Sequence, residues 1–351
     1  KPLLSVRAGQ TVRIRMNNRS RWPHGMHLHG HHFRQMLLEE QMGPLRDTLL
    51  MQPGEISEIA FVADNPGDWL LHCHMVEHAA AGMMTWLKVA EELEAGLVLR
   101  EDRDGIARIT LNRPRAYNAL SLGLMAALQS ELEKIATDQT VKAVVIEGAG
   151  KGFCAGHDLR EMRSRTDEAF HQTVFAACSQ LMLTVTDLPQ PVIAKVHGIA
   201  TAAGCQLVAT ADLAIAADST RFGTPGVNIG LFCSTPMVAV SRAIPRKQVM
   251  EMLLTGEMID AETAVAHGLI NRAVPETGLE DAAQEMAGKI ASKSPLVLKT
   301  GKKAFYRQLE MPLADAYAYT SQVMVDNMQA RDAAEGIDAF IEKRAPEWKG
   351  E

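Results

Sequence analysis

The stretches Gly148-Ala-Gly-Lys-Gly-Phe-Cys-Ala-Gly-His-Asp158 and Val196-His-Gly-Ile-Ala-Thr-Ala-Ala-Gly-Cys-Gln206 decide the fold of most of the chain. Each follows an apolar run that is typical of a strand, at 143–146 and 191–196, and each leads into a helical pattern. A strand, a small-residue turn and a helix N-terminus leave backbone N–H groups unpaired and directed at a concave site. Two such turns side by side would form an oxyanion hole, a pair of N–H donors that polarises a carbonyl. For a single turn, close packing of helix on strand is the alternative explanation.

Secondary-structure patterns divide the chain into two parts. Residues 1–89 are expected to be all-β, since 11–16 alternates apolar with polar or charged side chains in the period of a half-buried strand. A polar linker is expected at 90–96. Beyond it strands alternate with helices, and from about residue 260 the pattern is almost entirely helical. We therefore predict a two-domain chain, with a partial all-β sandwich followed by an α/β fold over 97–351 that ends in a helical region.

Composition and charge limit the classes of function. The 351 residues carry 36 Lys and Arg against 42 Asp and Glu, a net charge of −6, and the sequence has no basic stripe, which argues against nucleic acid as a partner. No apolar run approaches the ~18 residues of a membrane span. Residues 1–20 carry arginines in place of the apolar core of a signal peptide. We therefore expect a cytoplasmic protein with no membrane partner. The five cysteines lack paired spacing, which argues against a disulfide framework.

Eight of the 12 histidines lie between positions 24 and 78. Alternate side chains of a strand point to opposite faces, so Cys73 is expected to face away from His72 and His74. A thiolate, two imidazoles and a weak thioether form the ligand set of a blue-copper electron-transfer centre. The residues that offer this set are Cys73, His24, His78 and Met83. The imidazoles that remain as donors on the far side are those of His27, His29, His72 and His74.

Residues 1–89 resemble the C-terminal cupredoxin domain of multicopper oxidases, through His24-Gly-Met-His-Leu-His-Gly30 and His72-Cys-His-Met-Val-Glu-His78 with Met83. The resemblance implies that the first ligand set holds a mononuclear blue copper and that the four remaining histidines hold part of an oxygen-reducing trinuclear cluster. That cluster needs eight histidines, and the sequence has no further His-x-His pair outside residues 1–89. Because the chain begins at Lys1 directly before a strand, we expect an incomplete sandwich. Complete oxidase activity from this chain alone is not expected, and a remnant that binds copper weakly is the alternative.

Residues 97–351 resemble the crotonase (enoyl-CoA hydratase/isomerase) superfamily from end to end, and especially its subgroup of enoyl-CoA hydratase domain-containing protein 3. The motifs that carry the resemblance are Ile109-Thr-Leu-Asn-Arg-Pro114, Phe153-Cys-Ala-Gly-His-Asp158, Gly198-Ile-Ala-Thr-Ala-Ala-Gly-Cys205, Arg221-Phe-Gly-Thr-Pro225 and Phe340-Ile-Glu-Lys-Arg-Ala-Pro346. The resemblance implies an acyl-CoA thioester as substrate or ligand, with the amides of His157 and Ala203 as the oxyanion hole. It places Arg113, Ala155 and Asp158 in segments that contact CoA. It also implies a homotrimer or hexamer with the C-terminal helices at the interface.

The acid–base residues depart from the family's pattern. Hydratases of this family use two glutamates to hold and activate water, and the corresponding positions here are Gln206 and Gly226. Each general acid or base typically contributes ~10²–10⁴ in rate, so ordinary hydration is expected to be very slow. Three hypotheses stay open: lyase or isomerase chemistry on an acyl-CoA through a stabilised enolate, a non-catalytic acyl-CoA-binding protein of fatty-acid metabolism, and a copper-dependent oxidoreductase.

Several residues near these positions are substitute candidates for the missing acid and base. They are His157, Asp158, Asn228, Cys233 and Ser234. The alternatives are that Asp158 fixes its own turn and that Cys233, like Cys205, packs as a small buried hydrophobe. Two short cationic pairs, Lys302-Lys303 and Lys343-Arg344, are expected to be solvated, with contact to the CoA phosphates as the alternative.

Overall fold

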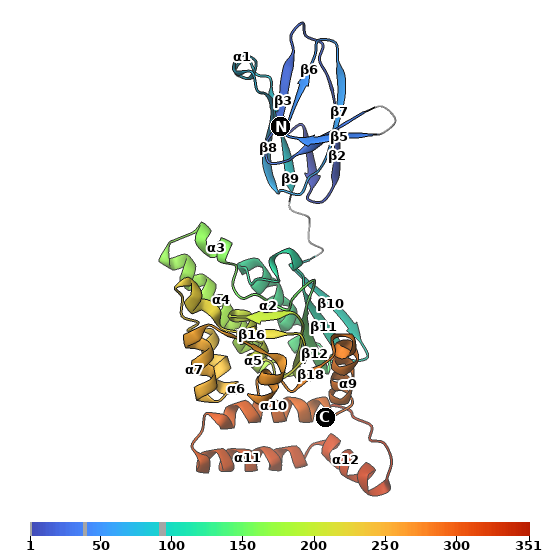
Figure 1. Ribbon diagram of the computed structural model, residues 1–351. Coiled ribbons are helices and arrows are strands. Elements are labelled where there is room, and N and C mark those ends of the chain that lie inside the picture. Colours follow the sequence, from blue (N-terminus) through green and yellow to red (C-terminus); the bar gives the residue numbers. More distant parts are fainter. Residues whose placement is uncertain (1, 38–40, 91–95) are drawn as a thin grey trace. The chain divides into compact units, whose positions relative to one another are not determined.

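The computed structural model describes residues 2–37, 41–90 and 96–351, and the chain forms two compact units, Lys1–Glu94 and Ala95–Glu351 (Figure 1). We call these the N-terminal unit and the C-terminal unit. Most of the linker expected at 90–96 lies outside the described residues. Among the helices of the described residues, none is both long enough and apolar enough to cross a bilayer.

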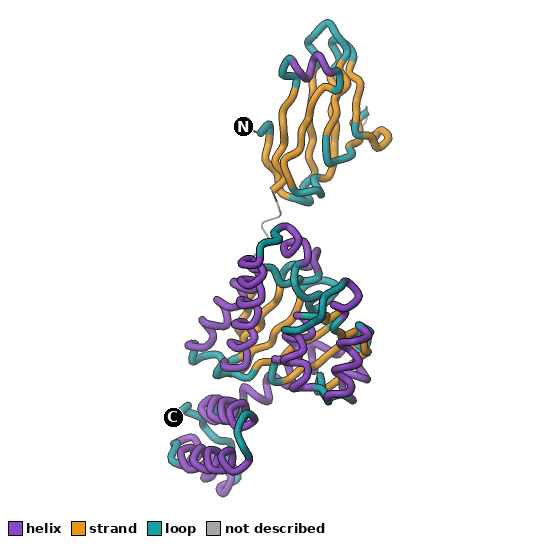
Figure 2. The backbone as a smooth tube through the Cα atoms, turned by 90° about the vertical axis from the view of Figure 1, so that its left-hand side faces the viewer, coloured by secondary structure: helices purple, strands orange, loops and turns teal. Residues whose placement is uncertain are grey.

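The N-terminal unit is built from two sheets (Figure 2). The strands of the first, in spatial order, are β1 (Leu4–Arg7), β9 (Met84–Ala90), β8 (Gly67–Cys73), β3 (His24–Leu28) and β6 (Thr48–Met51). Those of the second are β2 (Thr11–Asn17), β7 (Ile56–Val62), β4 (Phe33–Met36) and β5 (Met42–Arg46). A short helix, α1 (Val76–Ala80), follows β8. This unit is therefore almost entirely β, as the sequence predicts.

One core lies between the two sheets. On β2 the side chains of Val12 and Ile14 are buried while those of Arg13 and Arg15 are exposed, which confirms the predicted alternation. Large side chains from both sheets fill the interior; Phe33 and Ile59 belong to one sheet and Leu87 to the other, and all three are fully buried. Packing of two inner faces in this way is the principle of a β-sandwich.

The C-terminal unit is organised around a six-stranded sheet. Its strands, in spatial order, are β10 (Val98–Arg103), β11 (Ile106–Leu111), β12 (Ala143–Gly148), β13 (Val192–Val196), β15 (Leu213–Ala217) and β18 (Arg272–Val274). All neighbours are parallel except β10 and β11. A small second sheet contains β14 (Ile199–Thr201), β16 (Arg221–Gly223) and β17 (Met258–Asp260). The predicted strands at β11, β12 and β13 are confirmed, whereas β10 was not anticipated.

Helices pack on both faces of the main sheet. On one face α9 (Leu279–Ala291) contacts β11, β12 and β13, and on the other α2 (Leu122–Thr137) packs against α4 (Glu168–Asp187). The remaining helices before the C-terminal region are α3 (Leu159–Ser164), α5 (Ala203–Thr210), α6 (Pro236–Ala243), α7 (Arg246–Thr255) and α8 (Ala261–Ala266). The short 3₁₀ helices are η2 (Pro114–Ala116), η3 (Pro225–Ile229) and η4 (Glu276–Gly278). The carboxyl ends of parallel strands are where α/β folds place their ligands.

Three helices form the C-terminal region: α10 (Pro295–Leu309), α11 (Leu313–Met328) and α12 (Arg331–Glu342). A buried ion pair fixes α10 to the rest of the unit, with Lys302 Nζ 2.7 Å from an Asp212 carboxylate oxygen. Lys302 also donates to the carbonyls of Val185 and Gln190, and Tyr306 donates to Asp212. The Lys302 side chain is only 7% exposed, so the expectation that it is solvated was wrong. Burial lowers its pKa despite the neighbouring carboxylate.

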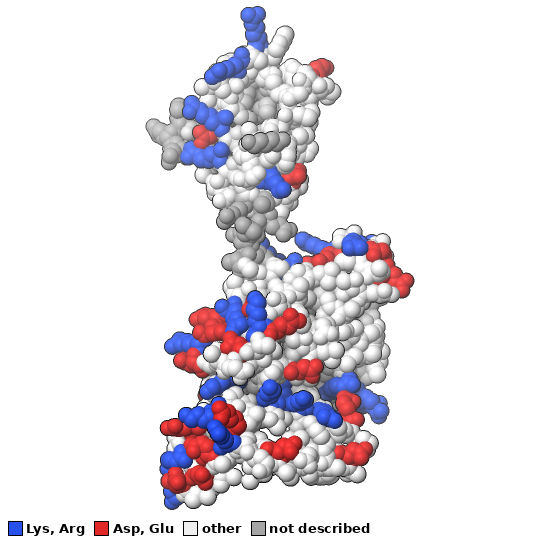
Figure 3. Space-filling view, turned by 180° about the vertical axis from the view of Figure 1, so that it is seen from behind, with Lys and Arg blue, Asp and Glu red and all other residues white. Residues whose placement is uncertain are grey.

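Several large apolar side chains of α11 and α12 lie open to solvent. Leu313 is 75% exposed, Phe340 84% and Ile341 70%. On the face shown in Figure 3, the described Lys and Arg side chains are interspersed with Asp and Glu.

Candidate functional site

The two small-residue turns run side by side in the C-terminal unit. The Thr201 amide donates to the Cys154 carbonyl at 3.0 Å, and the Thr201 hydroxyl donates to the Ala155 carbonyl at 3.0 Å. Residues 154 and 200 also form a parallel bridge. The turn that follows β12 and the turn that leads into α5 are therefore joined by hydrogen bonds.

Two glycines allow these turns to approach closely. A Cβ atom on Gly204 would lie 2.1 Å from the Cys154 carbonyl oxygen. Gly156 has φ +93°, and a Cβ atom there would lie 2.9 Å from Ala202 Cβ and 3.3 Å from the Ala203 nitrogen. Real Cβ atoms do not tolerate the shortest of these distances, and a positive φ favours glycine. The sequence of both turns is thus fixed by the space between them.

The backbone N–H groups of His157 and Ala203 have no acceptor among the described residues. Hydrogen bonds on either side hold residue 157, because the Leu120 amide donates to the Gly156 carbonyl and the Asp158 amide to the Leu120 carbonyl. Ala203 opens α5, where the first amides of a helix lack intrahelical partners. The preceding Ala202 has φ 48°, a conformation that is uncommon for alanine. The two predicted donors therefore occupy neighbouring positions, while their role stays a prediction.

Asp158 and Arg113 bind one another beside this turn. One Asp158 oxygen caps α3 by accepting from the amides of Arg160 and Glu161, and the other accepts from Arg113 at 2.9 Å. Burial opposes ionisation of Asp158, but these hydrogen bonds and the guanidinium keep its pKa below the usual value. Ala155 donates its amide to the Tyr117 carbonyl. These contacts support the structural explanation for Asp158, and the CoA contacts of the three residues stay predictions.

The His157 imidazole lies against the Phe175 ring, with a centroid separation of 5.4 Å. Its Nε2 is buried and has no hydrogen-bond partner among the described residues. Burial lowers the pKa of His157 to about 4, so the ring is neutral at pH 7.

The two positions where the sequence resemblance predicts the family's glutamates lie in different surroundings. Gln206, on α5, is only 4% exposed, and its side-chain oxygen accepts from the Cys178 thiol at 3.9 Å. Gly226, in η3, is enclosed by the loop that follows: a Cβ atom there would lie 2.5 Å from the Leu231 carbonyl oxygen and 2.9 Å from the Cys233 sulfur. The Gly226 carbonyl also accepts from the Leu231 amide. No side chain fits at position 226 unless this loop moves. No local sequence pattern predicts this enclosure.

The other substitute candidates are engaged or buried. All four cysteines of the C-terminal unit are free and buried, and burial raises the pKa of each thiol, which disfavours a nucleophilic thiolate. The Asn228 amide donates to the Gly256 carbonyl, and the Ser234 hydroxyl to the Phe232 carbonyl.

A second site lies in the N-terminal unit, where three potential metal ligands converge. The Cys73 sulfur is 3.7 Å from His24 Nδ1 and 3.6 Å from His78 Nδ1, and the two nitrogens are 3.1 Å apart. They come from β8, β3 and α1. The outer nitrogen of His24 contacts the Ser20 hydroxyl at 2.7 Å, a second partner of the kind that orients metal-binding histidines. The Met83 carbonyl accepts from the Cys73 amide, which holds that residue close by.

The other four histidines gather on the opposite side of Cys73. They are His27, His29, His72 and His74. Their neighbouring ring centroids lie 4.8 to 5.7 Å apart, and the Nε2 atoms of His29 and His72 are 3.1 Å apart. The cause is the register of β3 and β8, which pairs residue 27 with 72 and residue 26 with 73.

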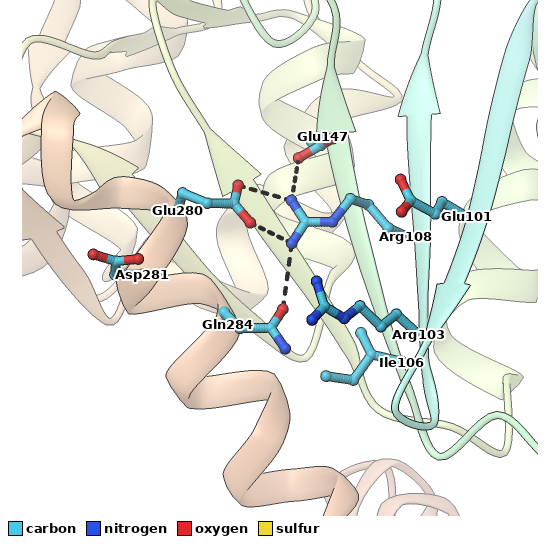
Figure 4. A pocket seen from close by; sticks show the side chains of 8 residues that line it. All are labelled: Glu101, Arg103, Ile106, Arg108, Glu147, Glu280, Asp281 and Gln284. Atoms are coloured by element: carbon cyan, nitrogen blue, oxygen red, sulfur yellow. Dashed lines mark hydrogen bonds and ion pairs between the residues drawn. The ribbon is translucent and has the colours of Figure 1, made fainter.

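A charged groove of about 510 Å³ lies beside α9 in the C-terminal unit, and sequence reasoning did not anticipate it (Figure 4). Arg108, on β11, donates to Glu147 and to Glu280, and Lys195 binds the same two carboxylates. The Arg108 guanidinium lowers the pKa of Glu280 to about 2. Arg108 and Lys195 therefore form ion pairs with both Glu147 and Glu280.

Comparison with known families gives a match for each unit. Residues 101–351 match the family model described as enoyl-CoA hydratase/isomerase, and residues 1–92 match the multicopper oxidase model. Both matches agree with the resemblances found in the sequence.

Among curated proteins, the chain is 48% identical over 257 residues to "Enoyl-CoA hydratase domain-containing protein 3, mitochondrial" of Rattus norvegicus, covering 73% of this chain and 86% of that protein. It is 34% identical over 251 residues to "Probable enoyl-CoA hydratase, mitochondrial" of Dictyostelium discoideum, covering 71% and 89%. Among solved structures, human enoyl Coenzyme A hydratase domain-containing protein 3 is 48% identical, with a TM-score of 0.70 over 72% of this chain and 99% of that one. The expected similarity to this subgroup is confirmed.

We predict that Gly226→Ala destabilises the C-terminal unit by about 1–3 kcal/mol, because the added methyl group overpacks the space beside the Leu231 carbonyl. Chemical denaturation of the full chain measures the change. Gly288→Ala is the control, since nothing lies within 4 Å of a Cβ atom there and alanine in a helix should stabilise by about 0.5–1 kcal/mol. Equal stability of the Gly226→Ala and wild-type proteins would show that the loop yields freely.

The buried His157 should make stability depend on pH. Its folded pKa lies below the value of 6.5 for a free histidine, so the unfolded chain takes up a proton first as the pH falls. Stability is therefore fully present above pH 6.5 and is lost between 6.5 and about 4, by up to about 3 kcal/mol. The unfolding free energy of wild type should fall more steeply in this window than that of His157→Gln. Parallel curves would contradict a neutral buried imidazole.

Proposed function

Because the chain belongs to the enoyl-CoA hydratase/isomerase family, we propose that its C-terminal unit binds an acyl-CoA thioester and stabilises the enolate formed from it. The observation that supports this proposal is the close approach of Gly156 to the Ala203 nitrogen, together with the lack of an acceptor for the amides of His157 and Ala203 among the described residues. A thioester oxygen bound between the amides of His157 and Ala203 would be polarised, and negative charge that develops on it would be stabilised.

The same site lacks an evident route for water activation. Gln206 stands at one of the positions where the family's hydratases carry glutamate, and an amide hydrogen-bonds water but does not accept its proton. Gly226 stands at the other, and the Leu231 carbonyl fills the space that a side chain would need. We therefore favour lyase- or isomerase-type chemistry at the enolate over ordinary hydration, with Arg113, Ala155 and Asp158 in the segments that contact CoA.

Non-catalytic binding of acyl-CoA is the alternative function of this unit. It is supported by the raised pKa values of the buried thiols and by the hydrogen bonds that already occupy Asp158 and Asn228. In this case the oxyanion hole would serve recognition of the thioester alone.

We also propose that the chain assembles as a homotrimer or hexamer. The exposed side chains of Leu313, Phe340 and Ile341 on α11 and α12 provide apolar surface for such an interface. A cytoplasmic location stays a prediction, and the curated relatives described above carry "mitochondrial" in their names.

Hydration of crotonyl-CoA tests the chemistry. We expect the wild-type rate to lie at least about 10⁴-fold below that of a hydratase with two glutamates, since two proton-transfer groups are missing. Gln206→Glu should raise the rate by about 10²-fold, while the matched Gln206→Met should not. A wild-type rate near that of a competent hydratase would refute our interpretation of Gln206 and Gly226.

The oxyanion hole is tested with a 3-ketoacyl-CoA, whose enolate is detected by ultraviolet absorption. Gly156→Ala places a methyl group 3.3 Å from the Ala203 nitrogen and should weaken binding of the enolate by roughly 10²-fold. Gly230→Ala is the matched control, because that glycine also has a positive φ but nothing lies within 4 Å of a Cβ atom there. If both variants bind the enolate equally weakly, backbone strain explains the effect. If neither variant binds the enolate more weakly than wild type, the proposed oxyanion hole is contradicted.

Copper-dependent electron transfer is a second candidate function, assigned to the N-terminal unit. The convergence of the Cys73 thiol with two imidazoles within 3.7 Å supports it, because a thiolate and two imidazoles are the donor set of blue-copper sites. Copper would be held by Cys73, His24 and His78, with Met83 as a weak fourth ligand, and would supply one-electron transfer. The four-histidine group offers only half of the ligands of a trinuclear cluster, so complete oxidase activity is not proposed.

Copper(II) added to the full chain should give the intense blue absorption of a copper–thiolate bond, and Cys73→Ser should abolish it. Cys233→Ser, which changes a buried cysteine of the other unit, should leave the band unchanged. A copper-loaded wild-type protein without colour would remove this candidate.

A further inference from the structure

The helix α12 is attached to the C-terminal unit through very little apolar surface. Of its twelve residues, only Asp332 and Ala339 are buried. The side chains of Ile337, Phe340 and Ile341 are exposed. Most helices in proteins are stabilised by burial of an apolar face, and α12 buries almost none. Polar contacts therefore have a larger part in fixing the position of this helix.

The chain turns back on α12 directly after the helix ends. Lys343 has φ 58°, the left-handed conformation in which many helices end. The Arg344 guanidinium then binds the Glu335 carboxylate through two hydrogen bonds of 2.6 and 2.9 Å. The Glu347 amide donates to the same carboxylate at 2.7 Å. Residues 344–351, which we call the C-terminal strap, thus run back along the helix.

The C-terminal strap reaches the buried carboxylate of Asp332 in the first turn of α12. One oxygen of this carboxylate accepts from the Lys349 amide at 2.8 Å. The other accepts from the Gly350 amide at 3.0 Å and from the Ser294 hydroxyl. The Asp332 amide in turn donates to the Glu351 carbonyl at 2.9 Å. Because Asp332 is only 1% exposed, loss of these partners would leave a buried charge without hydrogen bonds.

The C-terminal strap also contacts the corner between α9 and α10. The Trp348 indole donates to the Ser292 carbonyl at 2.9 Å, and a Cβ atom on Gly336 would lie 3.1 Å from the indole ring. Ser294, whose hydroxyl binds Asp332, is the N-cap of α10. The helix α9 packs on the main sheet, and α10 is held by a buried ion pair. The strap therefore joins α12 to two helices that are themselves anchored in the unit.

We propose that the C-terminal strap fixes the orientation of α12, with Asp332 as the positioning residue, and that assembly through the exposed apolar side chains of this helix depends on the strap. The fixed helix presents Phe340 and Ile341 to a second copy of the chain. The dependence of assembly rests on the homo-oligomer proposed above, whereas the role of the strap in holding α12 does not. All contacts of Asp332 described here lie within the C-terminal helices and the strap, so binding of an acyl-CoA should not require them.

Hydrogen exchange of the full chain, measured by mass spectrometry of its peptides, tests the role of the strap. Asp332→Asn should speed exchange of the α12 amides about 10- to 100-fold, because the new NH₂ group cannot accept hydrogen bonds from the strap. A chain that lacks residues 347–351 should show the same increase. Asp338→Asn is the matched control, since this aspartate is exposed on the same helix. Peptides of β12 and β13 should exchange as in wild type, which shows that the unit stays folded.

Sedimentation velocity measures assembly of the same proteins. Asp332→Asn and the shortened chain should both shift toward the monomer, while Asp338→Asn should not. The proposal is overturned if the first two exchange like the control. The dependence of assembly on the strap is overturned if exchange of α12 rises but both variants sediment like wild type. A monomeric wild-type chain would contradict the homo-oligomer instead, and exchange alone would then decide whether the strap holds α12.

Discussion

The C-terminal unit depends on the absence of side chains where two turns meet. Gly204 lies so close to the Cys154 carbonyl that a Cβ atom would overlap it, and Gly156 approaches the start of α5 in the same way. Any larger residue would separate the turn after β12 from the turn before α5. The close approach of Gly156 to the Ala203 nitrogen would then be lost. The main sheet positions this contact, because the two turns follow the ends of the parallel neighbours β12 and β13.

The surroundings of that contact favour stabilising charge on a ligand over supplying protons. Burial keeps His157 neutral and raises the pKa of the neighbouring thiols. The loop through Leu231 closes on Gly226, where a relative with an acid would need open space. In the N-terminal unit, too, groups from separate elements meet at one place: the Cys73 sulfur lies beside the imidazoles of His24 and His78.

Sequence patterns predicted the main helices and strands because the spacing of apolar side chains and the residue types of turns are local properties. The alternation of β2, the strands β11 and β12 and the opposite orientation of Cys73 and its neighbouring histidines all followed from spacing. The enclosure of Gly226 by Leu231 did not, because it depends on the path of a loop. The burial of Lys302 did not either, since a lysine on a helix is expected to face solvent until the position of Asp212 is known.

The ion pair between Lys302 and Asp212 has a consequence for the cooperativity of the C-terminal unit. If α10 peeled away, it would leave a carboxylate beside the start of β13 without its counter-charge, because Asp212 also accepts from the Val192 amide. Breaking one partner out of a buried pair is costly. Detachment of α10 is therefore expected to destabilise the start of β13, so that this helix and the central sheet should unfold together.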